Sequence, residues 1–559
     1  MIKQFLTDAL IQAMEDARDG GDLPFATLPD FSMDRPDNPA FGDFSINLAM
    51  IVASQAKLPP RQVAQIIIDH LRLPDRVLER VEVAGPGFIN FYLKPSWMHE
   101  VVQQIHTLGD AYGQVDLGKG RRVLAEYVSA NPNGPLSIPH GRGAIIGDVL
   151  CNVLSAAGFL VSREFYVNDA ATSTQMVRFG ESLVVRYLQE FGQELEFPED
   201  GYQGEYVGEF ARRITERDGD QYLHMPAAER LELFTALGKD EMLRWQREVL
   251  SSFGVEFDTW FRESALLESG AVEQGLAALE AHGATFERDG AVWLASSRYG
   301  DDKDRPLVRS NGKPTYLASD VAYHKNKFER GFDILIDVWG PDHHGYIART
   351  KAAMAALGYA PERLHVLIYQ VVRLLRNGEF VMGGKRKGDI VLLSELIEQV
   401  GRDAARFFFL LRSADSDLNF DIDLAIRESP DNPVYYVQYA HTRIAGILRT
   451  AEEKGIALPN PIGADLSPLT QQAEYSLMRM LADYPVEITT AAELYAPHRL
   501  TRYAQELARE FHVFYDQCPV LKDGVPSHVR DARLLLVGAA KITLKNVLTL
   551  LGISAPERM

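Results

Sequence analysis

Cysteine is almost absent from this sequence, whose 559 residues include only Cys151 and Cys518. Two cysteines can form neither the disulfide framework of a secreted protein nor a cysteine-based zinc site, so we expect a reducing, cytoplasmic location. The sequence also lacks any apolar run near the ~20 residues that cross a bilayer. The most conspicuous run, 407–411, is flanked by two arginines. We therefore expect no membrane partner.

Positive charge is also in deficit. Lysine and arginine total 58 against 77 aspartates and glutamates, which gives a formal net charge of −19. This balance argues against a protein that coats nucleic acid through a uniformly basic surface. It does not exclude a specific nucleic-acid partner, because affinity depends on where the basic side chains lie.

The length predicts several domains, because single hydrophobic cores stop growing near ~250–300 residues. Residues 1–105 combine amphipathic helices with strand-like sequence and predict a small α+β domain. Glycines at about 105–120 indicate a linker. Residues 431–559 carry helical apolar periodicity almost throughout and predict an all-α helical bundle. Its last helix presents one apolar stripe that ends near Gly552: Leu544, Val547, Leu548 and Leu551.

Residues 121–430 predict an α/β domain built from strand–loop–helix units. A strand at 122–128 leads through a turn-rich segment into an amphipathic helix, and a strand at 334–340 leads through 341–345 into another. Such units form doubly wound parallel sheets, which bind ligands beyond the carboxyl ends of their strands. We interpret the helix-rich, acidic stretch at about 175–290 as an insertion.

The loop after the first strand contains Asn131, His140 and Arg142 among prolines and glycines. Glycines let a ligand approach the backbone, and a helix N-terminus attracts phosphate. His140 and Arg142 would add donors for charge on a transferring phosphoryl group. Taken alone, the loop is better explained by a simple proline-glycine turn.

Three further motifs have the same ambiguity. The adjacent His343 and His344 favour nucleotide contact over a metal site, because consecutive residues rarely bind one ion. The cations of 385–387 lie between glycines, after a hairpin whose turn is 377–378, and form either a polyphosphate-closing loop or a solvated turn. Tyr316 and Asp320 share a face if helical, and either grip a cation or form a surface pair.

The combination of motifs resembles the bacterial type of the arginyl-tRNA synthetase family. Six segments occur in the family's order, and with the N-terminal block the resemblance covers essentially the whole chain: SANPNGPLSIPHGRGAIIGD, ESALLESG, TYLASDVAYHKNKFERGFDILIDVWGPDHHGY, GRDAARFFFLLRSADSDLNFDIDLA, NPVYYVQYAHTRI and LLGISAPERM. The resemblance implies a class I Rossmann-type catalytic domain in the centre. It also implies an N-terminal domain that contacts the tRNA elbow, and a C-terminal bundle that binds the anticodon stem and loop.

The implied activity is that of an arginine–tRNA ligase, acting as a monomer. ATP would activate L-arginine to arginyl-adenylate, with tRNA(Arg) already bound, and the arginyl group would pass to the tRNA 3′ end. By the same resemblance, the arginine site comprises Asn131, Glu263, Tyr316 and Asp320. The ATP site comprises Ser137, His140, Gly141, His343, His344 and Lys385. The tRNA-elbow contacts are Phe88 and Asn90. His140 and Lys385 would be the catalytic pair, and Mg²⁺ would arrive on the ATP phosphates rather than at a dedicated protein site.

Two departures from the family pattern stand out. The first signature, His-x-Gly-His, reads Ser137-Ile138-Pro139-His140, so a histidine and a glycine are replaced. The second, Lys-Met-Ser-Lys, aligns with 382–385 and keeps only its last lysine, Lys385, with Arg386 and Lys387 as candidates to compensate. Some family members instead carry a lysine just upstream of the first signature, where this chain has Gly134.

These departures leave two alternatives. One is a non-catalytic or altered tRNA-binding paralogue whose nucleotide loops have decayed. The other is a nucleotidyl-transferring enzyme on the same fold that activates a different amino acid. An arginine site of acidic and phenolic groups, which is kept in full, argues against both, because a guanidinium requires planar acidic acceptors.

Overall fold

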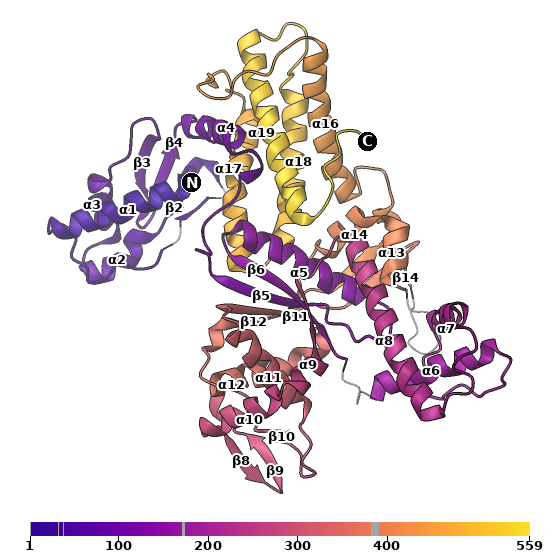
Figure 1. The fold of residues 1–559 in the computed structure, drawn as a ribbon. Helices are drawn as coiled ribbons and strands as arrows, with labels where there is room; N and C mark the ends of the chain where they lie inside the picture. The colour runs from indigo at the N-terminus through magenta and orange to yellow at the C-terminus, as the bar shows by residue number, and fades with distance from the viewer. Residues whose placement is uncertain (1, 32, 37, 170–173, 382–390) are drawn as a thin grey trace.

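The computed structural model describes residues 1–559 except 1, 32, 37, 170–173 and 382–390. Its N-terminal part is an antiparallel sheet of order β1-β2-β4-β3 with helices against it (Figure 1). This confirms the predicted α+β domain. Its elements are α1 (Ile2–Asp19), β1 (Met33–Asp34), η1 (Pro39–Phe41), β2 (Phe44–Ile46), α2 (Leu48–Ala56), α3 (Pro60–His70), β3 (Leu78–Ala84) and β4 (Phe88–Leu93).

Helix α4 (Ser96–Leu108) and the short η2 (Gly109–Ala111) connect this sheet to the rest of the chain, and α4 packs on two helices of the C-terminal bundle. Two ion pairs also join the N-terminal part to the bundle, Arg35 with Asp483 and Asp43 with Arg479, each at 2.7 Å. The N-terminal domain is therefore fixed to the bundle rather than hung from a free linker.

The centre is a five-stranded parallel sheet of order β12-β11-β5-β6-β7. Chain order reverses between β5 and β11, so this is the doubly wound arrangement, and ligands are expected at that switch point. Helix α5 covers one face of the sheet, and α11 and α12 cover the other (Figure 1). The elements are β5 (Arg122–Tyr127), α5 (Ile138–Ala156), β6 (Leu160–Val167), β7 (Thr259–Arg262), α11 (Tyr316–Glu329), β11 (Ile334–Trp339), η4 (Pro341–Tyr346), α12 (Ile347–Ala356), η5 (Pro361–Arg363) and β12 (Leu364–Ile368).

The expected insertion at about 175–290 is divided in two, because β7 pairs with β6 inside the parallel sheet. The first part is helical and lies between β6 and β7: α6 (Thr174–Glu190), α7 (Glu205–Asp218) and α8 (Ala227–Ser252). The second lies between β7 and α11 and includes a small antiparallel sheet: α9 (Glu263–Glu268), α10 (Ala271–Ala281), β8 (Thr285–Arg288), β9 (Ala291–Leu294), η3 (Ser296–Tyr299) and β10 (Arg305–Val308).

After β12 the chain forms the predicted hairpin. Asn377 and Gly378 both have positive φ, 53° and 76°, as a two-residue type I′ turn requires. The segment forms a three-stranded sheet flanked by short helices, with the elements β13 (Val372–Arg376), β14 (Glu379–Phe380), α13 (Leu393–Val400), α14 (Arg402–Phe409), β15 (Leu418–Asp421) and α15 (Ile422–Ala425).

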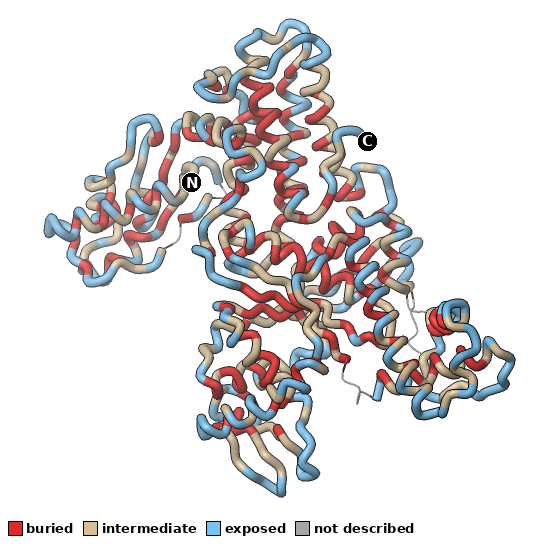
Figure 2. Tube along the Cα trace, in the orientation of Figure 1, coloured by how far each residue is buried: buried red, intermediate tan, exposed pale blue. Residues whose placement is uncertain are grey.

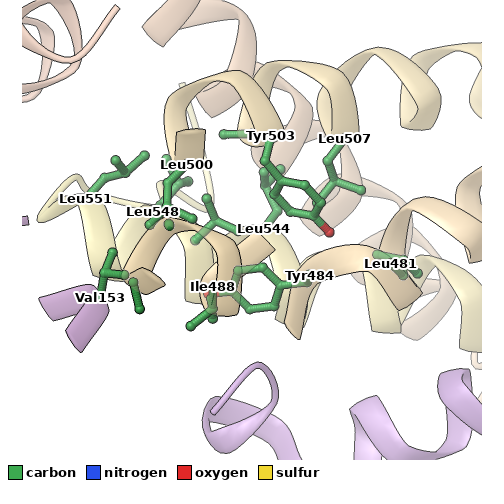
Figure 3. Close-up of a cluster of buried hydrophobic side chains, with 14 of the residues drawn as sticks. Val153, Leu481, Tyr484, Ile488, Leu500, Tyr503, Leu507, Leu544, Leu548 and Leu551 are labelled. Atoms are coloured by element: carbon green, nitrogen blue, oxygen red, sulfur yellow. The ribbon is translucent and has the colours of Figure 1, made fainter. Parts of the chain in front are cut away.

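The C-terminal part is the predicted helical bundle, with helices α16 (Pro433–Glu453), α17 (Gln472–Glu493), α18 (His498–Gln517) and α19 (Ser527–Leu551). The predicted stripe of α19 is buried, and Gly552 ends the helix with a φ of 68°. Figure 3 shows Leu544, Leu548 and Leu551 facing the other bundle helices, with Val153 of α5 beside them.

Burial is concentrated on the central sheet and on the facing sides of the bundle helices (Figure 2). Helix α19 is long and apolar enough to span a membrane, but 72% of its most apolar stretch is buried inside the protein. We therefore assign it as the core helix of the bundle. The apolar core runs without a break from the N-terminal domain through α5 into the bundle.

Candidate active site

The first predicted loop leaves β5 with strained backbone. Val128 and Ser129 have φ values of 69° and 42°, a left-handed conformation that is costly for residues other than glycine and most of all for a β-branched valine. Ser129 Oγ accepts from the Tyr166 N–H at 3.1 Å and donates to Glu126 Oε1 at 2.8 Å. The strained backbone is therefore held by contacts to β5 itself and to the neighbouring strand β6.

Helices α6 and α8 of the insertion hold the same loop from outside. Asn131 Nδ2 donates to Gln175 Oε1 at 3.1 Å. The buried Gln246 of α8 donates from Nε2 to the carbonyl oxygens of Asn131, at 3.2 Å, and of Gly134, at 2.9 Å. Asn131 remains exposed, so its side chain is accessible to a ligand.

Ser137 and His140 form the N-terminal cap of α5. Ser137 is the N-cap residue, and its N–H donates to Nδ1 of His140 at 3.1 Å. Because Nδ1 accepts, the ring proton lies on Nε2, and burial lowers the pKa of His140 to about 4. His140 is thus a neutral donor at pH 7. Pro139 lies in the first turn, where a missing N–H costs nothing.

Arg142 does not have the role expected from the sequence, and Gly141 is required for packing. The guanidinium of Arg142 is buried and donates to the carbonyl oxygens of Gln370, Ser413 and Ser416 at 2.8–2.9 Å, so Arg142 is no phosphate donor. Gly141 is buried at a helix crossing, where a Cβ would lie 2.4 Å from Cδ1 of Leu393. The glycine is required there for packing.

The second loop, η4, follows β11 at the switch point. His343 and His344 are exposed, and the ring of His343 lies between Trp339, at 6.0 Å, and Tyr346, at 5.4 Å. The guanidinium of Arg349 stacks on Tyr346 at 3.4 Å. This aromatic, cation-flanked surface can accept a planar base.

Two carboxylates converge at the carboxyl ends of β6 and β7. Glu263 begins α9, Asp320 lies in the second turn of α11, and the hydroxyl of Tyr166 bonds to Glu263. Burial raises the pKa of Glu263, and Asp320 and Asp169 raise it further. Burial also raises the pKa of Asp320 to about 6. These paired acids form a site that favours a cationic ligand.

Tyr316, the fourth expected arginine contact, is the first residue of α11 and is 76% exposed. Lys385 and the rest of 382–390 lie outside the described residues. The described chain resumes against the first loop, since Leu392 bridges to Ser137 and the Leu393 N–H donates to Leu136 at 2.9 Å. In the described part of the chain, no group of three histidine, cysteine or acidic side chains is placed to hold a metal ion.

The two expected tRNA contacts differ from each other. Phe88 is 38% exposed at the start of β4. Asn90 is 2% exposed, and its Oδ1 accepts from Ser45 Oγ on the neighbouring strand at 2.7 Å. In this structure, Asn90 supports the sheet and presents no amide at its surface.

The sequence analysis missed Tyr166, Ser129 and Gln246. Tyr166 and Ser129 each follow or end a parallel strand, so the rule that placed the two loops could have identified them. Gln246 lies on a helix of the insertion and gave no local signal.

Comparisons with known proteins agree with this architecture. The family model described as "Arginyl tRNA synthetase N terminal domain" matches residues 2–93, and that described as "DALR anticodon binding domain" matches 437–559. The arginine–tRNA ligase of Carboxydothermus hydrogenoformans is 49% identical over 95% of this chain and 94% of its own length. That of Moorella thermoacetica is 49% identical over 100% of this chain and 99% of its own.

Solved structures show the same fold. The arginyl-tRNA synthetase of Thermus thermophilus matches with a TM-score of 0.76 at 24% identity, and the two chains cover each other fully. That of Plasmodium falciparum matches with a TM-score of 0.75 at 17% identity, covering 100% of this chain and 99% of its own. With relatives nearly half identical along its whole length, the chain belongs to the arginyl-tRNA synthetase family.

Proposed function

We propose that the chain is an arginine–tRNA ligase. It activates L-arginine with ATP to arginyl-adenylate, releases pyrophosphate, and transfers the arginyl group to the 3′ end of tRNA(Arg), releasing AMP. The observation that carries this proposal is the pair of carboxylates, Glu263 and Asp320, brought together at the ligand-binding edge of the sheet.

Two carboxylates and a phenol match a forked cation. A guanidinium offers planar, paired N–H donors, which two carboxylates can accept in fixed geometry, whereas the single ammonium of lysine cannot satisfy both. In this proposal Glu263, Asp320 and Tyr316 bind the guanidinium. Asn131, exposed on the loop that leaves β5, binds the amino-acid backbone.

The nucleotide lies toward α5 and η4. The N-terminus of α5 favours the phosphates, and the Nε2–H of His140 can donate to charge that develops on the α-phosphate. His343 and His344 line the base side, and Lys385 stabilises the departing pyrophosphate. Mg²⁺ binds the ATP phosphates, because magnesium commonly reaches a protein with its substrate.

The departures at the first signature are compatible with catalysis. Ser137 caps α5 and fixes the tautomer of His140, and Pro139 occupies a helix position that accepts proline. The changed first signature is therefore weaker support for a non-catalytic paralogue than the sequence alone suggested.

The bundle carries a surface suited to unpaired bases. Tyr435 stacks on Tyr439 with ring centres 6.1 Å apart, and Arg443 lies over Tyr439 and Tyr515 at 4.8 Å and 4.6 Å. Aromatic and guanidinium planes are the usual platforms for single-stranded RNA. We propose that this face binds the anticodon loop and that Phe88 contacts the tRNA elbow. We further propose a monomer that acts in the cytoplasm.

The test is arginylation of tRNA(Arg) by the purified full-length chain with ATP. We expect activity in the wild type and a rise of about a hundredfold or more in the KM for arginine in Asp320→Asn, the scale of one charged partner lost from a buried pair, about 3 kcal/mol. The KM for ATP should change little.

The matched control is Glu287→Gln, which removes an exposed carboxylate of the same domain. An inactive wild type would overturn the proposed reaction. A normal arginine KM in Asp320→Asn would overturn the site alone.

A further inference from the structure

Beneath the proposed arginine site, the sheet buries a row of three carboxylates. Asp337 of β11 pairs in register with Glu126 of β5, and Glu126 pairs with Glu164 of β6. Paired residues of parallel strands point to the same face. All three are buried, with exposed fractions of 0%, 6% and 0%.

Helix α11 and its C-cap residue, Arg330, supply the cations for this row. Lys327 Nζ donates to Asp337 Oδ1 at 2.8 Å and also to Glu126. Arg330 donates to both oxygens of Glu164, at 2.6 and 2.9 Å. Because isolated buried charges are costly, these pairs fix α11 in one position on the sheet.

His324, also on α11, has an oxygen within hydrogen-bond distance of each ring nitrogen. Its Nδ1 lies 2.8 Å from the carbonyl oxygen of Asp320, and its Nε2 lies 2.8 Å from Oδ2 of Asp337. Both partners are acceptors, because Asp337 is ionised: burial would raise its pKa, but Lys327 and His324 overcome this and lower it to about 2. A neutral imidazole has one N–H, so two donated bonds require two protons.

We infer that His324 and Lys327 are positioning residues for the arginine site, which fix Asp320 toward the substrate and keep its carboxylate charged. The inference rests on the proposed role of Asp320. The buried network is balanced, with His324, Lys327 and Arg330 against three carboxylates. The charge that faces the ligand is therefore that of Asp320 and Glu263.

The charged groups around Asp320 come from several elements. His324 and Lys327 of its own helix and Arg349 of α12 lower its pKa, whereas burial and Glu126 of β5 raise it. Glu263 of α9 lies on the substrate side. Among the cations, His324 has the largest effect. Without this cation the carboxylate would be protonated nearer to neutral pH and could not bind a guanidinium as an anion.

The first experiment measures the charge of His324 directly in the wild-type chain. The chain has 14 histidines, so ¹⁵N-histidine spectra of the full-length protein are assigned by the signal lost in His324→Gln. We expect two protonated ring nitrogens at pH 7. One protonated and one bare nitrogen would overturn the inference, and this result does not depend on a variant's activity.

The second experiment measures kcat/KM for arginine against pH in tRNA-dependent arginylation. In His324→Gln we expect the acidic limb to move up by about one pH unit. The value of kcat/KM for arginine should then fall about tenfold at pH 5, where one pKa unit is a factor of ten, but only about twofold at pH 7. The KM for ATP should change less than about twofold. Lys325→Gln, which removes a cation that pairs with Glu329 at the surface, is the matched control and should leave the limb in place.

A merely structural role gives a different result. Activity of His324→Gln would then fall equally at every pH, with an unmoved limb, and the inference would be wrong even if Asp320→Asn loses arginine binding. If Asp320→Asn itself binds arginine normally, the proposed site fails instead, whatever the spectrum of His324 shows.

Discussion

At strand β5, the two faces of the five-stranded sheet are packed by different means. On the α5 face, Val123, Ala125 and Tyr127 of β5 are buried against apolar residues of the helix. On the α11 face, Leu124 of the same strand is apolar, but Glu126 ends the row in a network of charges. The strands of the sheet therefore contribute a row of buried carboxylates on the α11 face, at the ligand-binding end. On the α5 face the buried carboxylate belongs to the helix, where Asp148 pairs with Arg406 and with Arg163 of β6.

This difference separates stability from function. Apolar packing is the less costly way to join a helix to a sheet, and replacing buried ion pairs by apolar residues is often neutral or stabilising. Helix α5 needs only to be close, and it approaches through Gly147, whose Cβ would lie 2.2 Å from the ring of Tyr127. Helix α11 must hold Asp320 in one place, and directional pairs provide that.

The largest expected effect comes from breaking the charged face at its centre. Lys327→Met leaves Glu126 and Asp337 buried without their shared cation, and we expect a loss of about 3–5 kcal/mol in the stability of the catalytic domain. Urea denaturation followed by tryptophan fluorescence measures it. Lys325→Met is the control, because Lys325 lies on the same helix but pairs with Glu329 at the surface. It should lower the stability by less than about 1 kcal/mol.

A rescue variant sharpens this result. Adding Glu126→Gln to Lys327→Met neutralises the carboxylate that is left without a cation, while Asp337 keeps its pair with His324. The double variant should recover a large part of the lost stability. If Lys327→Met alone unfolds no more readily than Lys325→Met, the buried network does not hold α11.

The apolar face is tested by adding one methyl group. Gly147→Ala improves helix propensity but forces Tyr127 or α5 to move, so we expect a net loss of about 1–3 kcal/mol in the same assay. Gly208→Ala in α7 is the control, because a Cβ there meets no atom within 4 Å. It should stabilise its helix by up to about 1 kcal/mol. Equal effects of the two substitutions would contradict the close approach of α5.

The apolar face was the part that the sequence predicted well. The buried stripe of α5, the strands β5 and β11 and the stripe of α19 all follow from local periodicity, which reports burial on one face directly. Strand β7 was missed inside the expected insertion. It has only four residues, none of them buried, and it pairs at the edge of the sheet.

The charged network on the α11 face could not be predicted from local sequence patterns. Glu126, Glu164 and Asp337 meet through strand register, and no spacing in the sequence encodes which strands are neighbours. Glu263 and Asp320 were identified by resemblance rather than by pattern. Arg142 was misread for the related reason that a cation in a glycine-rich loop is typical of a phosphate site, whereas in the structure the residue lies inside α5 and is buried.

The smallest expected effect distinguishes the three paired carboxylates of the buried network from Asp320, which faces the proposed arginine site. Burial raises the pKa of Asp320 to about 6, above its unfolded value of about 3.9, so folding favours the protonated form. The stability from that proton is complete below about pH 4 and is lost as pH rises through 6. Asp320→Asn should therefore be more stable than the wild type at pH 8, by about 1–2 kcal/mol, and equal to it near pH 4. Thermal unfolding at the two pH values measures this.

Because a ligand stabilises the state that binds it, L-arginine should raise the Tm of the wild type at pH 8 more than L-lysine does, and should not do so in Asp320→Asn. A variant that is less stable than the wild type at pH 8 would show that Asp320 is already neutralised within the fold, as the three network carboxylates are, and does not await a cationic substrate.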